Sequence, residues 1–161
     1  MVPVRWYPCQ HSHTSESAAR CRAGAAAQCC RYPDPKHGSG CRLVLLEDND
    51  AVRMATELFL TLEGFDTRAA ATVAEAEGML SEMRSGDILI ADYHLDGKLT
   101  GLDVLRQLRA QQGRDVPTIL LSGDLQSMMR MVKSPIPNCR FLSKLVDTKA
   151  LLSAIVELGA S

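Results

Sequence analysis

Between residues 42 and 158, five short strand-like segments, most of them apolar, alternate with five segments that have the spacing of amphipathic helices. Runs of this length, bounded by turn residues, predict strands. Strands that alternate with helices predict an α/β fold, in which a parallel sheet has right-handed crossovers and helices on both faces. The expected strands are Arg42–Leu46, Phe65–Ala69, Asp87–Ala91, Val116–Leu121 and Cys139–Leu142. The expected helices are Asp50–Leu62, Thr72–Arg84, Leu102–Gln112, Leu125–Val132 and Asp147–Leu158.

Acidic residues close two of these strands. Glu47 and Asp48 follow the first apolar run, and Asp92 ends the third. We expect a doubly wound, five-stranded parallel sheet with the flavodoxin-like order 2-1-3-4-5, which is one of the two common doubly wound orders. In that order the first and third strands are neighbours, and ligands bind beyond the carboxyl ends of the strands. Three carboxylates that converge there repel one another unless a cation neutralises them, and a set of oxygen ligands suits Mg²⁺.

The length and composition favour one folded domain. The chain has 161 residues, of which 46% are hydrophobic and 23% charged, as is usual for a globular protein. A formal net charge of -1 gives no reason to expect a nucleic-acid or membrane partner. No apolar stretch approaches the roughly 18 residues that span a bilayer. We therefore assign residues 41–161 to a single domain.

Residues 1–40 differ from the rest of the chain. They contain no Leu or Ile, and they carry five Lys or Arg against two acidic residues. Such a segment cannot bury enough apolar surface to offset the entropy of ordering, so we predict a disordered N-terminal extension. A basic arm that binds a metal or a partner through Cys9, His11 and His13 is the alternative.

The cysteines indicate a reducing compartment. None of the six forms a Cys-x-x-Cys pair, and they are not spread through the predicted fold as in disulfide-rich secreted domains. Residues 1–30 also lack the continuous apolar core of a secretory signal. We therefore expect reduced thiols and a cytoplasmic location.

Four segments give the chain a family resemblance. They are Leu43–Asp50, Ile88–Leu95, Leu120–Gly123 and Phe141–Lys144. In order and spacing they resemble the motifs of the response-regulator receiver domain, the phosphoacceptor module of two-component signalling. Asp92–Gly97 followed by Thr100 and Gly101 is most similar to receivers attached to hybrid sensor kinases.

The resemblance implies a role for each residue at the strand ends. Asp92 would be the nucleophile that takes a phosphoryl group from a phosphohistidine. Asp48 would bind Mg²⁺ directly, and Glu47 would help through water or its longer reach. His94 would offer its backbone carbonyl to the metal.

The later motifs supply the groups that would bind the phosphoryl oxygens. Ser122 would donate from its hydroxyl and Lys144 would contribute a fixed positive charge. Phe141 stands at the aromatic switch position. Phosphorylation would then favour an alternative surface around Leu125–Val132, Cys139–Leu142 and the last helix.

The resemblance also implies the partners. They are a histidine kinase or a histidine phosphotransfer protein, a downstream protein target, and a second copy that dimerises through the fourth helix, the fifth strand and the fifth helix. The protein would catalyse only its own phosphorylation and dephosphorylation, so it would not be an enzyme in the usual sense. Because the sequence ends after the last helix, we expect no output domain.

Two positions depart from the family pattern. Leu145 stands where the family has proline, and since a cis bond before a non-proline residue costs about 2.5–4 kcal/mol, we predict a trans Lys144–Leu145 bond. Glu47 stands where most members have Asp. A degenerate receiver, which acts as an unphosphorylated protein-interaction module, is the alternative; Leu145 favours it weakly and the other motif residues oppose it. A related phosphatase would need a second acid where His94 stands.

Overall fold

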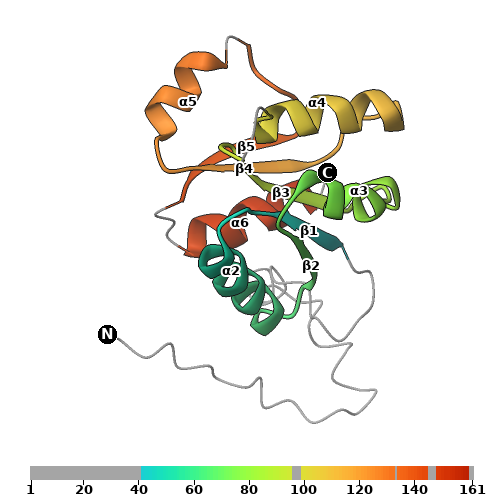
Figure 1. Ribbon diagram of the computed structural model, residues 1–161, viewed down its shortest axis with the longest axis vertical. Coiled ribbons are helices and arrows are strands. Elements are labelled where there is room, and N and C mark those ends of the chain that lie inside the picture. The colour runs from blue at the N-terminus through green and yellow to red at the C-terminus, as the bar shows by residue number, and fades with distance from the viewer. Residues whose placement is uncertain (1–40, 96–98, 133, 145–147, 160–161) are drawn as a thin grey trace, which may run out of the picture. The chain divides into compact units, whose positions relative to one another are not determined.

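The computed structural model describes residues 41–95, 99–132, 134–144 and 148–159, and it forms the predicted α/β sheet (Figure 1). Within these residues five parallel strands pair in the order β2-β1-β3-β4-β5, which confirms the flavodoxin-like, doubly wound fold. The strands are β1 (Arg42–Leu46), β2 (Asp66–Ala70), β3 (Ile88–Asp92), β4 (Thr118–Ser122) and β5 (Cys139–Ser143). The helices are α2 (Asp50–Leu62), α3 (Val73–Ser81), α4 (Gly101–Gln112), α5 (Leu125–Met131) and α6 (Thr148–Gly159).

Alternate residues of each strand face opposite sides of the sheet and build two cores. Leu43 and Leu45 of β1 pack in the core that α2 and α6 cover, whereas Val44 and Leu46 pack in the core under α3, α4 and α5. Because both faces are covered, β3 and β4 are buried along their whole length. The sheet is therefore a rigid frame whose carboxyl edge positions the side chains that follow its strands.

Several predicted boundaries were wrong by one to three residues. The last four strands end one residue later than predicted, and β4 begins two residues later because Pro117 cannot donate to a sheet hydrogen bond. The helix predicted to reach Arg84 ends at Ser81, since the Arg84 N–H donates to Asp87 Oδ2 (2.8 Å) instead of continuing the helix. Asp147, the predicted start of the last helix, lies outside the described residues.

α2 leaves part of its apolar surface exposed. The helix begins where expected, with Asn49 Oδ1 accepting from Val52 N (3.1 Å). Leu60 is its buried residue, whereas Leu58 and Leu62 are 60% and 76% exposed. The helix carries apolar residues on two arcs, and periodicity alone does not tell which of them faces the sheet. An apolar surface is thus left on the outside of α2.

Substituting Gly78 by alanine is expected to stabilise the fold. Gly78 lies inside α3, and a Cβ added there meets nothing within 4 Å. Alanine in a helix interior is favoured over glycine by about 0.8–1 kcal/mol, largely because the unfolded chain loses freedom. Urea unfolding should show a higher midpoint at an unchanged slope. A midpoint equal to or below that of the wild type would contradict this expectation.

The described residues also give one observation on membrane spans and one on the thiols. In the part of the chain that the structure describes, no helix combines the length and apolar character needed to cross a membrane. Cys41 and Cys139 are free, and burial raises the pKa of each thiol to about 11, so both stay protonated at neutral pH. The other four cysteines and the predicted N-terminal extension lie outside the described residues.

Candidate functional site

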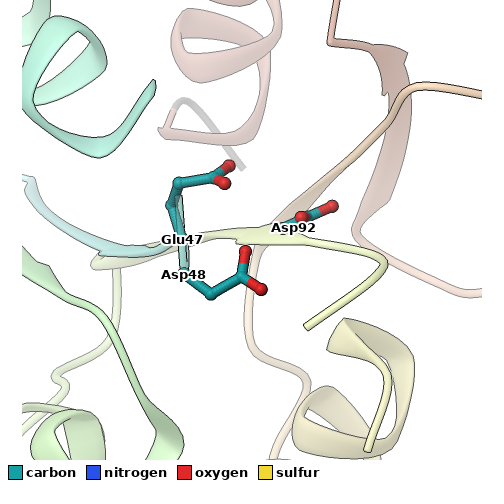
Figure 2. Close-up of side chains that lie close together, drawn as sticks. All are labelled: Glu47, Asp48 and Asp92. Carbon is teal, nitrogen blue, oxygen red and sulfur yellow. The ribbon is translucent and has the colours of Figure 1, made fainter. Parts of the chain in front are cut away.

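Three carboxylates lie together at the carboxyl edge of the sheet (Figure 2). β1 pairs with β3 so that Leu46 stands opposite Ala91, which brings Glu47 and Asp48 beside Asp92. One oxygen atom of each carboxylate lies within 4.8 Å of the others. Glu47 and Asp92 are only 1% and 3% exposed, while Asp48 is half-buried. The strand order thus produces the convergence that the sequence suggested.

Lys144 reaches this cluster from the end of β5. Its Nζ donates to Asp92 Oδ2 at 2.5 Å and to Glu47 Oε1 at 3.0 Å. Burial opposes the charged amine, but the hydrogen bonds that Lys144 donates to Asp92 and Glu47 outweigh it and raise the pKa of Lys144. The chain therefore places a permanent positive charge directly on the Asp92 carboxylate. Hydrogen bonding of Lys144 N to Ser122 O (2.8 Å) fixes where this side chain starts.

The cluster keeps one buried oxygen unsatisfied. Glu47 Oε2 has no hydrogen-bond partner among the described residues, and burial raises the pKa of this carboxyl more than Lys144 lowers it. An unpaired buried carboxylate oxygen is costly, and a divalent cation would satisfy it. Carboxylate oxygens are also the ligands that Mg²⁺ prefers. Glu47, Asp48 and Asp92 therefore fit a magnesium site.

The remaining predicted site residues surround the cluster. His94 is exposed and its backbone N–H donates to Asp92 Oδ1 (3.0 Å). Ser122 is fully buried at the end of β4, where its hydroxyl oxygen accepts from Asp124 N (3.1 Å). That contact uses a lone pair and leaves the hydroxyl hydrogen to be donated. Phe141 is half-buried against the core under α5. The Lys144–Leu145 bond, Asp96 and Gly97 lie outside the described residues.

Two residues to which the sequence analysis assigned no role support the loops of the cluster. Arg53 of α2 donates from Nη1 to Glu47 O at 2.9 Å. Gly101, the first residue of α4, donates to Tyr93 O (3.0 Å) and lies against the backbone of Asp92. The available signals were an arginine five positions after Asp48 and a glycine directly after the helix cap Thr100.

Comparison with known families and proteins points the same way. The response regulator receiver domain model matches residues 43–156. The transcriptional regulatory protein AfsQ1 of Streptomyces coelicolor is 38% identical over 80 residues, which are 50% of this chain and 34% of that protein. The chain thus spans about a third of the length of this curated relative.

Solved structures share the fold. The response regulator receiver protein of Sinorhizobium medicae has a TM-score of 0.65 at 22% identity, covering 76% of this chain and 97% of that one. The receiver protein of Pseudomonas putida has a TM-score of 0.62 at 24% identity, covering 75% and 99%. The receiver domain of the hybrid histidine kinase CckA has a TM-score of 0.57 at 26% identity, covering 73% and 97%.

Proposed function

Since this chain belongs to the response regulator receiver domain family, as its motifs indicated, we propose that it accepts a phosphoryl group from phosphohistidine on Asp92 with Mg²⁺. One observation carries the proposal: Asp92 is held between two further carboxylates and the Lys144 ammonium, whose Nζ lies 2.5 Å from Asp92 Oδ2. A carboxylate nucleophile, a cation site and a fixed positive charge are the parts that phosphoryl transfer to an aspartate needs.

Each residue has a separate task in this reaction. An Asp92 oxygen attacks the phosphorus, the P–N bond to the donor histidine breaks, and an acyl phosphate forms while the donor imidazole leaves. Glu47, Asp48, Asp92 and the His94 backbone carbonyl would hold Mg²⁺, which would neutralise the charge of the phosphoryl oxygens. Lys144 moves from the Asp92 oxygen to a phosphoryl oxygen, and the Ser122 hydroxyl donates to another. Receiver domains in general are not enzymes that turn over a separate substrate, and the reaction modifies the protein itself.

Exposed apolar residues support the proposed protein partners. On α2, which follows the acidic loop, Met54, Leu58 and Leu62 are exposed, and this outer face suits the docking of a histidine kinase or phosphotransfer protein. On α5, Met128 is buried, whereas Met129 and Met131 are exposed. Met129 and Phe141 line a groove of about 410 Å³ beside β5. We assign the downstream target, or a second copy, to this surface of α5, β5 and α6.

Reaction with a small phosphodonor tests the acceptor role of Asp92. We expect acetyl phosphate or phosphoramidate with Mg²⁺ to add one phosphoryl group to the wild type, visible as a single adduct in the intact mass. Asp92→Ala should give no adduct, and removal of Mg²⁺ by a chelator should suppress the adduct on the wild type. Asp66→Ala, which removes an exposed acid at the start of β2, should react like the wild type.

The same mass measurement distinguishes a phosphoacceptor from the alternative, a receiver that acts without being phosphorylated. A wild type that stays unmodified with both donors at millimolar Mg²⁺ would favour the unphosphorylated interaction module. An equal adduct on Asp92→Ala would place the acceptor elsewhere.

A further inference from the structure

The side chain of Arg53 donates hydrogen bonds to the backbone of the loop that carries Glu47 and Asp48. Arg53, in the first turns of α2, turns back so that its Nη1 donates to the backbone carbonyl of Glu47 (2.9 Å) and approaches that of Asp48 (3.5 Å). Its Nη2 meets Asp50 Oδ1 at 2.5 Å. The side chain is only 19% exposed, so most of it is withdrawn from water.

Arg53 differs from Lys144 in what it contacts. Lys144 bonds to carboxylate oxygens, which a bound cation would need. Arg53 instead donates to the backbone carbonyls of Glu47 and Asp48, so their carboxylate oxygens stay available to a cation. It therefore fixes the direction of the two acidic side chains without competing for their ligand atoms.

The loop has a second support that makes its geometry specific. Asn49 N donates to Glu47 Oε1 (3.2 Å), and Arg53 N donates to Asn49 O (2.8 Å), so the acids, the cap and the guanidinium form one connected unit. Glu47, which is 1% exposed, keeps its Oε2 unpartnered among the described residues. That buried, unpaired oxygen indicates a cation ligand rather than a chance acidic cluster.

We propose that Arg53 is a positioning residue that holds Glu47 and Asp48 in the geometry that binds a divalent cation, and so sets the affinity for Mg²⁺. The inference rests on the proposed function, because it assigns a role at the same site. The planar guanidinium suits the task, since its rigid fork can bridge neighbouring acceptors and stays charged at any working pH.

A positioning role and simple electrostatics predict opposite effects of removing Arg53 on the affinity for Mg²⁺, so one binding measurement separates them. A positive charge beside a cation site repels the cation, so deleting Arg53 should tighten Mg²⁺ binding if charge is all that matters. Loss of positioning should weaken it, since removing groups that orient metal ligands typically costs 10–100-fold in affinity.

The experiment is calorimetric titration of the full chain with Mg²⁺. We expect Arg53→Met to weaken binding by about tenfold and Arg53→Lys to give an intermediate loss. Asp50→Asn is the matched control: it removes the ion pair with Arg53 at an exposed acid but leaves both loop carbonyls bonded, and should keep the dissociation constant within about twofold. Phosphorylation of Arg53→Met should need more Mg²⁺ yet reach the wild-type extent at saturation.

The possible outcomes are distinct. If Arg53→Met binds Mg²⁺ as tightly as the wild type or more tightly, Arg53 is a structural residue only, whatever its effect on thermal unfolding. If Arg53→Met does not fold, unchanged affinity in Arg53→Lys overturns the inference in the same way. A wild type that binds no Mg²⁺ at millimolar concentration removes the metal site itself, and with it the magnesium step of the proposed function.

Discussion

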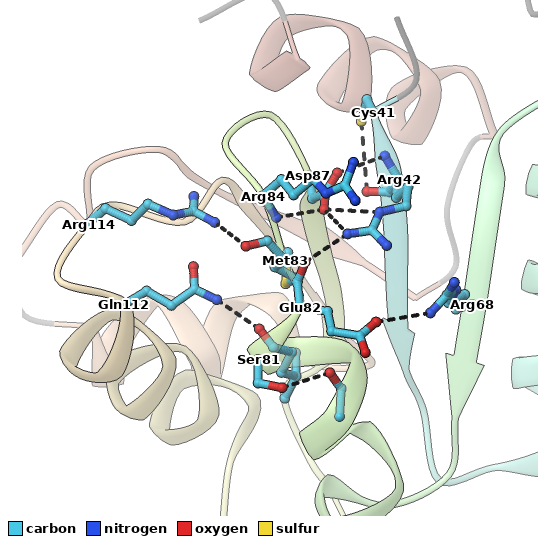
Figure 3. A network of polar contacts seen from close by, with 12 residues as sticks. Cys41, Arg42, Arg68, Ser81, Glu82, Met83, Arg84, Asp87, Gln112 and Arg114 are labelled. Atoms are coloured by element: carbon cyan, nitrogen blue, oxygen red, sulfur yellow. Dashed lines mark hydrogen bonds and ion pairs between the residues drawn. The ribbon is translucent and has the colours of Figure 1, made fainter. Parts of the chain in front are cut away.

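Replacing Asp87 with alanine is expected to lower the free energy of unfolding by about 3–5 kcal/mol. Asp87 is buried, directly before β3, and therefore at the amino edge of the sheet (Figure 3). It accepts from Arg42 N (3.2 Å), Arg42 Nε (3.2 Å), Arg42 Nη2 (2.8 Å) and Arg84 N (2.8 Å). Alanine would leave a largely buried guanidinium and two backbone N–H groups without their acceptor. Urea unfolding at neutral pH measures the loss.

The pH dependence of stability gives an independent check on Asp87. Burial alone would raise the pKa of this carboxyl, but the hydrogen bonds from Arg84 N and from Arg42 outweigh it and lower the pKa. A carboxyl with a lowered pKa in the folded state stabilises above its unfolded value of about 3.9, and this contribution is lost as the pH falls through the folded value. The difference in stability between the wild type and Asp87→Asn should therefore be constant from pH 7 to 5 and narrow below about pH 4.

An exposed ion pair provides the control. Arg68 and Glu82 are both exposed, with a distance of 3.5 Å between charged groups. Arg68→Gln should change the free energy of unfolding by less than about 1 kcal/mol, since such pairs contribute little. A loss as large as that of Asp87→Ala would mean that charge removal in general, and not the buried network, explains the effect.

The fold was largely predictable because its signals are local and repeated. Four of the five strands contain apolar runs and the helices α2 to α5 each have an N-cap residue, so element types and order followed from the sequence, and alternating strands and helices indicated a parallel sheet. The ends of helices were less predictable where a tertiary contact competes with the helix for a backbone N–H. At Arg84 the side chain of Asp87 takes the backbone N–H that a longer helix would use, and nothing local to that helix announces it.

The face of α2 was unpredictable for a different reason. Phe59 and Leu60 point to one arc and Leu58 and Leu62 to another, and both arcs are apolar. A helix that is apolar on two sides satisfies the periodicity rule in two ways. Only the packing on β1 and β2 decides which arc is buried, so the exposed apolar arc looks like core in the sequence.

At the site, the sequence indicated the charged side chains that meet at the edge of the sheet but not the residues that contact their loops. Acids at strand ends stand out, because the strand order itself brings them together. Arg53 donates to backbone carbonyls, and nothing in the sequence distinguishes an arginine that makes this contact from any other arginine on a helix. The same holds for Gly101, whose importance depends on how closely α4 approaches β3.

Replacing Gly101 with alanine is expected to impair both the fold and the site. Gly101 begins α4, and a Cβ added there would lie 2.2 Å from Asp92 O and 3.1 Å from Leu120 Cδ2. Backbone cannot give way as a flexible side chain can, and the Gly101 N–H is bonded to Tyr93 O (3.0 Å). We expect a loss of about 1–3 kcal/mol in the free energy of unfolding, as for other overpacked sites.

The effect on Asp92 should exceed the effect on stability. The clash pushes on the carbonyl of the proposed acceptor itself, and a displacement of about 1 Å can cost a hundredfold in rate. Phosphorylation by acetyl phosphate, followed below the unfolding temperature, should therefore slow by about that factor. Gly78→Ala makes the same change in open space on α3 and should leave the rate unchanged. A Gly101→Ala protein that is phosphorylated at the wild-type rate would show that the approach of α4 does not position Asp92.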